Sequence, residues 1–232
     1  MSEETTLIKR GILITMDGRR RVIHGGHLLI IGDRIATVSK SEEEARGGMT
    51  PDNVIDAKGH LVLPGLINCH LHLPQTLMRG LVDDVDAMTK LKYFTWPIQG
   101  HFTREEAEIS TLVTLLELIK TGTTTFLSTG LHPRYDIDNM IRWVERSGLR
   151  AVISKYVMYM PHDATEKGAL HPGMLEDKEE SLSEFKRLYN EWHGKGDGRI
   201  SIWISPRSVG ACSPSLLKEV SRLAEERGVG IH

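Results

Sequence analysis

The chain has 232 residues, a formal net charge of −2 and 40% apolar residues, which excludes a disordered or fibrous protein and gives no sign of a nucleic-acid partner. The acidic start of the chain, Met1 to Glu4, lacks the layout of a signal peptide, and no apolar stretch approaches the length of a membrane span. We therefore expect a cytoplasmic protein without a membrane partner. The two cysteines, Cys69 and Cys212, cannot form a disulfide framework, and we expect both to be reduced thiols in the core.

Short strands separated by turns dominate the start of the chain. Turn pairs such as Asp17-Gly18, Gly25-Gly26 and Gly32-Asp33 break a series of apolar or β-branched runs, a spacing typical of hairpins. The runs are Leu7-Ile8, Ile12 to Thr15, Leu28 to Ile31 and Ile35 to Val38. Residues 41–53, rich in Glu and Gly, predict a surface loop. We expect residues 1–59 to form a small antiparallel β-sandwich segment.

After Gly59, predicted strands alternate with predicted helices. Strands are expected at residues 60–72, 123–127, 151–158 and 200–205, and Val229 begins a fifth. Helices are expected at residues 103–122, around 140–148, at 178–193 and at 213–228, the last with Ser213 as its N-cap. The first helix opens with a Thr103/Glu106 capping box. Its apolar stripe, which we expect to cover the sheet, comprises Ile109, Leu112, Val113, Leu116 and Ile119.

Strand–helix units at this interval predict an α/β fold with a parallel sheet and favour a (β/α)8 TIM barrel. Residues 60–232 would supply its N-terminal half, about four and a half βα units, whereas a closed barrel takes about 250 residues. We therefore expect the chain to be part of a longer protein. A doubly wound sheet is the alternative fold that would let it be complete.

The motif with the clearest chemistry is His70-Leu71-His72, at the end of the first predicted barrel strand. Side chains alternate along a strand, so both imidazoles point to the same side, and active sites of barrels lie at this end of the strands. Two neutral imidazoles placed in this way can share one zinc ion. An isolated His-x-His is more often an ordinary surface or core pair, so the assignment depends on the surrounding motifs.

The surrounding motifs resemble those of the amidohydrolase superfamily, and most closely its cytosine-deaminase-like branch with the triazine hydrolases. They are Val54 to Gly59 leading into Leu63-Pro64-Gly65, His72 to Leu81, Trp96-Pro97, Ser205-Pro206-Arg207 and Cys212-Ser213-Pro214. The resemblance implies a metal-dependent aminohydrolase, with Zn2+ or alternatively Fe2+. Its substrate would be a small nitrogen heterocycle that loses an exocyclic group by hydrolysis of a C–N or C–Cl bond. We also expect a homo-oligomer.

The resemblance assigns His70 and His72 to the metal. Members of the superfamily add a His on strand five, usually a His on strand six, and an Asp on strand eight, with a Glu following the strand-five ligand. His232 stands at the strand-five position, but many relatives read Ile-His-x-His-x-x-Glu with the second His as ligand, and we favour a ligand just after residue 232. The proton-handling groups are expected there too, so residues 1–232 alone should be inactive. Residues 200–205 lack the Lys that bridges two metals in binuclear relatives, which predicts one zinc per subunit.

Four side chains are candidates for substrate binding. Arg207 follows Pro206 where nucleoside-type relatives tend to have His, and its guanidinium can hold a carbonyl or carboxylate by a forked hydrogen bond. Gln99 stands where those relatives often have Glu, Gln75 follows the metal pair, and Trp96 can stack on a ring. The structural alternatives are a rim Arg, loop hydrogen bonds and core packing. Four further residues are predicted to be loop histidines: His101, His132, His162 and His171.

Two other interpretations remain open. One is the ring opening of an imidazolone-type cyclic amide. The other is a non-catalytic fragment or pseudo-enzyme whose half barrel persists by pairing with another chain. Four strands and the start of a fifth leave two open sheet edges, so residues 1–232 alone should give an aggregate, a dimer or a molten species.

Overall fold

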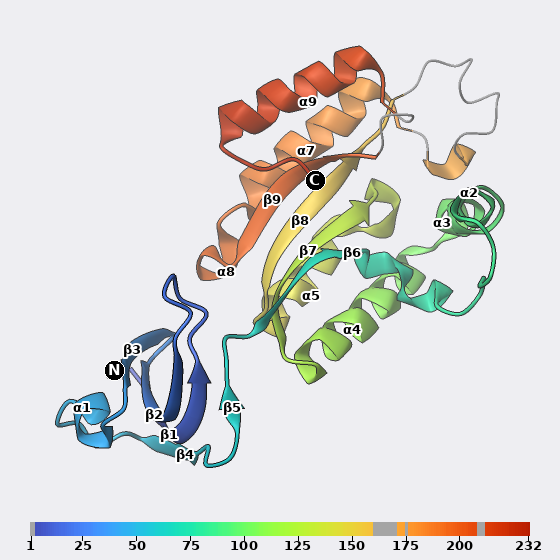
Figure 1. The fold of residues 1–232 in the computed structure, drawn as a ribbon. Helices are drawn as coiled ribbons and strands as arrows, with labels where there is room; N and C mark the ends of the chain where they lie inside the picture. The colour runs from blue at the N-terminus through green and yellow to red at the C-terminus, as the bar shows by residue number, and fades with distance from the viewer. Residues whose placement is uncertain (1–2, 160–170, 175, 208–211) are drawn as a thin grey trace. The chain divides into compact units, whose positions relative to one another are not determined.

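The computed structural model describes residues 3–159, 171–174, 176–207 and 212–232, which form two compact units, Met1–Gly65 and Leu66–His232 (Figure 1). The first unit extends past residue 59, where we placed the boundary. The reason is that β5 (Leu61–Val62) pairs with β1 (Thr5–Ile14). None of the helices in these described ranges is both long and apolar enough to cross a membrane.

The first unit is built on a sheet in the order β3-β2-β1-β4, with β5 also beside β1. Strands β2 (Val22–Ile31) and β3 (Arg34–Ser39) form the expected hairpins, but β4 (Asn53–Asp56) and β5 run parallel to β1. The expectation of an antiparallel segment was therefore wrong for these two strands. A parallel neighbour needs a crossover connection. The helix α1 (Glu42–Arg46) belongs to that connection, in a segment that we predicted to be loop.

The second unit contains a four-stranded parallel sheet in the order β6-β7-β8-β9. These strands are β6 (Leu66–Leu71), β7 (Thr123–Leu131), β8 (Arg150–Val157) and β9 (Ile200–Pro206). Ile231 then forms a parallel bridge with Ile204 of β9, so a fifth strand begins where the sequence predicted it. The sheet is an arc of the predicted barrel.

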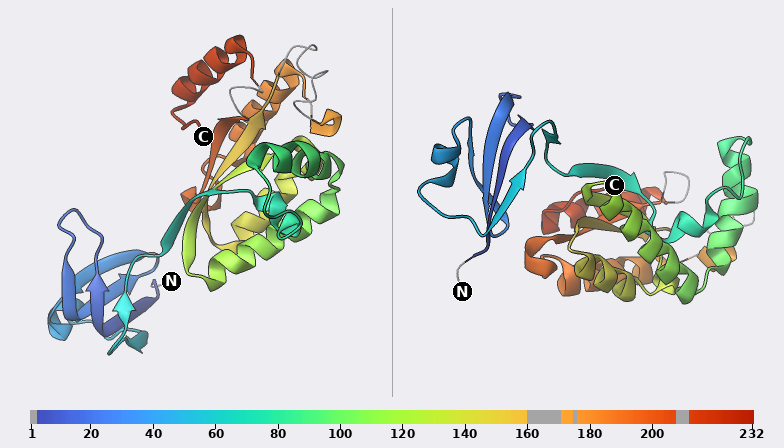
Figure 2. Two further views of the ribbon diagram at one scale, coloured as in Figure 1. Left: turned by 45° about the vertical axis from the view of Figure 1, so that its right-hand side comes forward. Right: turned by 90° about the horizontal axis from the view of Figure 1, so that it is seen from below.

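Four helices follow the four strands and pack along one side of the sheet (Figure 2). They are α4 (Arg104–Lys120), α5 (Ile137–Ser147), α7 (Lys178–Trp192) and α9 (Pro214–Arg227). The predicted capping box of Thr103 and Glu106 is present, and the Ser213 side chain caps α9. Short elements occupy the connections: η1 (Leu73–Met78), α2 (Ala87–Lys90), η2 (Leu91–Thr95), α3 (Trp96–His101), η3 (Pro133–Tyr135), η4 (Pro172–Met174) and α8 (Lys195–Gly198).

The apolar stripe of α4 does not cover the sheet, contrary to our expectation. Its side chains remain 36–57% exposed: Ile109, Leu112, Val113, Leu116 and Ile119. The buried face carries Ala107, Leu115 and Leu118, which belong to the core, together with small polar residues, two of which bind η1. The Ser110 hydroxyl accepts a hydrogen bond from the Thr76 amide at 2.7 Å, and the Thr114 hydroxyl donates to the Leu73 carbonyl at 3.3 Å. The helix therefore packs through core leucines and through these hydrogen bonds to η1, and not through the stripe.

The two cysteines differ in their surroundings. Cys212 is buried as expected, but Cys69 is exposed and is not a core residue. Its strand, β6, pairs only with β7 within the described residues and therefore lies at an edge of the sheet.

Candidate metal centre and substrate pocket

His70 and His72 lie together at the C-terminal end of β6. His70 belongs to the strand, and His72 follows it with a backbone that is still extended, at φ −121° and ψ 97°. The alternation of side chains therefore continues through His72. The two ring centroids are 5.0 Å apart and the rings are nearly perpendicular, at 87°.

His232 joins this pair from the start of the fifth strand. Its amide donates to the Ile204 carbonyl at 3.1 Å, which fixes its place beside β9. Its Nε2 atom lies 3.0 Å from Nδ1 of His70, so one of these two nitrogens carries the shared proton. We favoured a ligand after residue 232, yet the geometry brings His232 itself against His70.

Two hydroxyl groups hold the backbone of His232 in this position. The Ser205 hydroxyl on β9 donates to the His232 carbonyl oxygen at 2.8 Å. The Thr129 hydroxyl on β7 lies 2.8 Å from Ser205 Oγ, and both side chains are buried. Since Ser205 uses its hydrogen on His232, Thr129 is the donor to Ser205. Three strands are thus linked directly below the imidazoles.

A glycine makes room for His72. Gly130, near the end of β7, has φ +86°, and a Cβ atom at this position would lie 2.6 Å from Nδ1 of His72. Only glycine combines this backbone conformation with such a close approach. The sequence offered no signal that distinguished Gly130 from other glycines.

The imidazoles are suited to a metal by their protonation state. Burial, followed by the positive charges of His70 and Arg207, lowers the pKa of His72 to about 4. Burial and His70 also lower the pKa of His232. The Nδ1 atoms of His72 and His232 are buried without a hydrogen-bond partner among the described residues. Neutral imidazoles with free nitrogens are the form that binds zinc.

The three imidazoles do not yet form a complete metal shell. Within the described ranges, no group of three or more His, Cys, Asp or Glu side chains could hold a metal ion as arranged. The direct contact between His70 and His232 accounts for this, because their nitrogens face each other instead of a common point. The donor set fits a zinc ion in its chemistry, and binding would replace the contact between the two rings.

A cavity of about 370 Å³ opens in front of the imidazoles. Among the predicted substrate-binding residues, Gln75, Gln99 and Arg207 line it, together with all three histidines. Trp96 does not line the cavity; its ring lies beneath the Arg207 guanidinium, 5.6 Å from centroid to Cζ. Six further residues line the cavity and were not assigned to the site from the sequence: Leu91, Thr95, Thr129, Tyr156, Ser205 and Pro206. A signal was available for Tyr156 and Ser205, which stand near the ends of predicted strands, whereas Thr129 lies after the strand predicted at residues 123–127.

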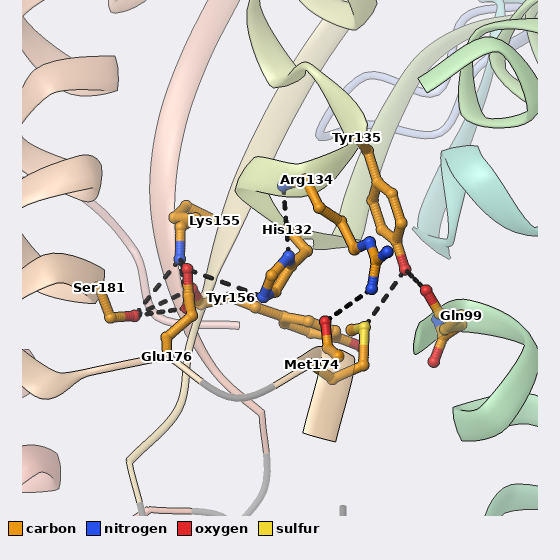
Figure 3. Close-up of polar contacts among 10 residues, drawn as sticks. Gln99, His132, Arg134, Tyr135, Lys155, Tyr156, Met174, Glu176 and Ser181 are labelled. Carbon is orange, nitrogen blue, oxygen red and sulfur yellow. Dashed lines mark hydrogen bonds and ion pairs between the residues drawn. The ribbon is translucent and has the colours of Figure 1, made fainter. Parts of the chain in front are cut away.

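Gln99 is held in the cavity wall by contacts to its main chain (Figure 3). The Tyr135 hydroxyl donates to the Gln99 carbonyl at 3.0 Å, and Arg134 donates to the carbonyls of Gly100 and, at 2.8 Å, Gly173. Gln99 is 2% exposed, and its Nε2 atom has no acceptor in the described part of the chain. The loop after β7 therefore fixes an amide donor at the edge of the cavity.

A buried ion pair lies on the opposite, helix-covered side of β8 (Figure 3). Lys155 is fully buried and donates to both carboxylate oxygens of Glu176, at 2.8 and 2.9 Å, and to Ser181 Oγ at 3.3 Å. Burial lowers the pKa of Lys155, and the carboxylate opposes that shift. A lysine inside an apolar strand was a visible signal of such a pair, but the sequence did not reveal Glu176 as its partner.

His132 belongs to the same buried cluster. It is 6% exposed, its Nδ1 atom accepts from the Arg134 amide at 3.3 Å, and its Nε2 atom lies 4.0 Å from Glu176. Burial, Lys155 and Arg134 lower the pKa of His132 to about 3. His132 lies in a loop between β7 and η3, as predicted, and it is buried there. His162, predicted in the same way, lies outside the described residues.

Comparisons with known proteins identify the family of this chain. Residues 61–232 match the amidohydrolase family. The chain is 34% identical over 227 residues to a 5-methylthioadenosine/S-adenosylhomocysteine deaminase of Desulforamulus reducens, covering 97% of this chain and 48% of that protein. It is 35% identical over 232 residues to a 5′-deoxyadenosine deaminase of Methanobrevibacter smithii, covering 100% and 48%.

A likeness of fold extends to solved structures. An adenosine deaminase from Xanthomonas campestris, solved with bound zinc, superposes with a TM-score of 0.83 at 21% identity, over 98% of this chain and 48% of that one. At this identity the match shows the fold alone. The chain spans about half the length of the curated relatives it matches.

Proposed function

Because this chain belongs to the amidohydrolase family, we propose that it supplies the metal centre and part of the substrate cavity of a zinc-dependent aminohydrolase, with Fe2+ as the alternative metal. The reaction is the hydrolysis of an exocyclic C–N or C–Cl bond on a small nitrogen heterocycle. The relatives named as deaminases support the C–N bond as the target. A cytoplasmic enzyme is part of the same proposal.

The convergence of His70, His72 and His232 is the observation that carries the proposal. We assign all three as metal ligands, because their rings are within 5.0 Å of each other in consecutive pairs and two of them are held neutral. Zinc bound by such ligands lowers the pKa of its water toward neutrality and so provides a nucleophile. We propose one ion per subunit. In support, β9 contains no Lys, and Lys155 is engaged by Glu176 on the other side of the sheet.

Three of the other residues that line the cavity bind the heterocycle in this proposal. Gln75 and Gln99 present amide groups to the ring, and Arg207 binds an oxygen substituent. Trp96 acts through Arg207, as a surface on which the guanidinium rests, rather than by stacking on the substrate. The resemblance puts the proton-handling groups after residue 232, so residues 1–232 by themselves would bind metal without turnover.

A homo-oligomer is also proposed. The exposed apolar stripe of α4 supports it, since contiguous apolar surface on a folded unit marks an interaction site. The stripe runs along one helix and can therefore meet its own copy across a two-fold axis.

The metal assignment is tested by zinc uptake. We expect about one zinc ion per chain after loading and dialysis, measured by elemental analysis, and none in His70→Ala. His24→Ala, at an exposed position of β2, is the matched control and should keep the metal. Two ions per chain, or an unchanged content in His70→Ala, would contradict the assignment.

The reaction is tested in a chimera. This chain replaces the matching half of the Methanobrevibacter smithii relative, and ammonia release is measured with adenine, guanine and amino-triazine compounds, while chloride release is measured with a chloro-triazine. Turnover that His70→Ala abolishes supports the proposal. A folded, zinc-loaded chimera without turnover on any of these compounds would count against it, and turnover by residues 1–232 alone would contradict the proposed division of roles.

A further inference from the structure

Arg207 brings a positive charge into the cavity without a carboxylate beside it. Its Cζ atom lies 5.4 Å from the Tyr156 ring centroid and 5.6 Å from that of Trp96. No Asp or Glu in the described ranges forms an ion pair with it, although other arginines such as Arg187 have such partners. Aromatic faces stabilise the cation, but they leave the N–H groups in the guanidinium plane without acceptors.

Gln99 adds a second donor to the same cavity. Its Nε2 atom is buried and has no acceptor among the described residues, while Tyr135 and the neighbouring Arg134 contacts keep its main chain in place. A buried donor without a partner is unfavourable in a folded protein and calls for an explanation. A ligand atom at this edge of the cavity could accept a hydrogen bond from Gln99 Nε2 and so satisfy this donor.

The balance of charge in the cavity points to the kind of ligand. Of the described residues that line it, Arg207 is the one with a permanent charge, and none is Asp or Glu. No carboxylate among the described lining residues is available to accept from the hydroxyl groups of a sugar. An anionic substituent would instead neutralise Arg207 and accept from its planar fork of donors.

We propose that the cavity selects heterocycles bearing a negatively charged oxygen substituent, a carboxylate or an ionised oxo group, over neutral nucleosides. Arg207 binds this substituent through two parallel N–H groups, and Gln99 donates to a neighbouring ring atom. The rings of Tyr156 and Trp96 contact the guanidinium and restrict where it can lie. The inference rests on the proposed function for the identity of the ring as substrate, but the charge preference belongs to the part of the cavity that this chain lines and does not require turnover.

The test is a binding measurement on metal-free protein. The probes are 2-aminopyrimidine-4-carboxylate and 2-aminopyrimidine-4-carboxamide, which share the exocyclic amine and differ in charge. Each probe is titrated into the chelator-treated full chain near neutral pH in a calorimeter. The carboxylate should bind at least roughly tenfold more tightly than the carboxamide, as expected for a charged hydrogen-bonded pair. Arg207→Met should remove the preference, and Arg207→Lys should retain part of it because the charge remains.

Arg104→Met, at an exposed position at the start of α4, is the matched control and should keep the full preference. Circular dichroism of each variant shows whether it is folded. Equal affinity of the two probes for the unsubstituted chain, a preference that survives Arg207→Met, or no binding of the carboxylate at millimolar concentration would each overturn the inference. Because no hydrolysis is measured, these outcomes are independent of the zinc-uptake and chimera experiments. A carboxylate that binds only after zinc is restored would be a metal ligand, which also overturns it.

Discussion

Nδ1 of His70 and Nε2 of His232 lie 3.0 Å apart, although 162 positions separate the two residues in the chain. Loss of a residue that only hydrogen-bonds to a metal ligand lowers metal affinity by roughly 10–100-fold. If His70 and His232 both bind the same ion, His232→Ala should weaken zinc binding by more than that. Competition with a chromogenic chelator measures this affinity. An unchanged zinc affinity in His232→Ala would mean that His232 is not a ligand and that the third ligand lies after residue 232.

Gly130 leaves the space that the His72 ring occupies, so a substitution at Gly130 tests the position of His72. Gly130→Ala should lower zinc affinity, because the new Cβ atom would contact Nδ1 of His72 at 2.6 Å. Gly148→Ala is the control, with a similar φ of +77° but no atom within 4 Å of the new Cβ. Both variants should lose about 1–2 kcal/mol of stability from the left-handed backbone. A loss of zinc affinity in Gly130→Ala alone is the expected result, and equal zinc affinity in the two variants would contradict it.

The depressed pKa of His132 predicts a loss of stability in acid. An unfolded histidine takes up a proton as the pH falls below 6.5, whereas buried His132 stays neutral down to about pH 3. The unfolded state therefore binds more protons in this window, and unfolding becomes easier as the pH falls, by up to roughly 1.4 kcal/mol per pH unit. Above pH 6.5 the two states are equally neutral at this site, and His132 contributes no pH dependence.

His132→Asn removes the titration while an amide oxygen can still accept from the Arg134 amide. Urea unfolding at several pH values should give a shallower loss of stability between pH 6.5 and 4 than in the unsubstituted chain. His24→Asn, on the exposed side of β2, should leave the profile unchanged. A His132→Asn profile parallel to that of the parent would mean that other groups govern the acid response.

The Lys155–Glu176 pair should show strong coupling. Lys155→Met leaves a buried carboxylate without its partner and should destabilise the fold by about 3–5 kcal/mol. Glu176→Leu should act in the same direction, while the double variant should lose much less than the sum of the two. Urea denaturation of the four proteins measures the coupling. Additive losses would mean that the pair contributes little beyond the packing of its side chains.

The exposed stripe of α4 predicts self-association. Leu112→Glu combined with Leu116→Glu should shift the sedimentation profile toward the monomer, because both side chains lie in the apolar stripe. Ser183→Glu, at an exposed position of α7, adds a charge elsewhere and should not change the profile. A parent chain that sediments as a monomer at all concentrations would contradict both this prediction and the expectation that four strands with open edges associate.

Local signals in the sequence were sufficient for much of the fold. Alternating strands and helices, the caps at Thr103 and Ser213, and the shared side of His70 and His72 depend on neighbouring residues and were predicted. The contacts that we did not predict join segments that are far apart in the chain. Glu176 meets Lys155 only once α7 is placed on β8, and His232 meets His70 only through the curvature of the sheet.

The buried face of α4 shows a second reason why the sequence did not predict every feature. Apolar periodicity locates the largest hydrophobic stripe, but this helix approaches η1 closely through Ser110 and Thr114. Close approach favours small side chains and specific hydrogen bonds, which a count of apolar residues does not detect. A count of apolar residues likewise does not detect the hydrogen bond between the Thr129 and Ser205 hydroxyl groups in the cavity lining.

The contrast between the two cysteines gives this chain a built-in labelling position. Cys69 is exposed and directly precedes His70, whereas Cys212 is 3% exposed. A maleimide dye would therefore react preferentially at one thiol, on the strand that carries the metal pair. Its fluorescence would report occupancy of the neighbouring imidazoles by a quenching ion such as Cu2+ or Co2+, so that binding kinetics could be followed in a stopped-flow instrument without introducing any new residue.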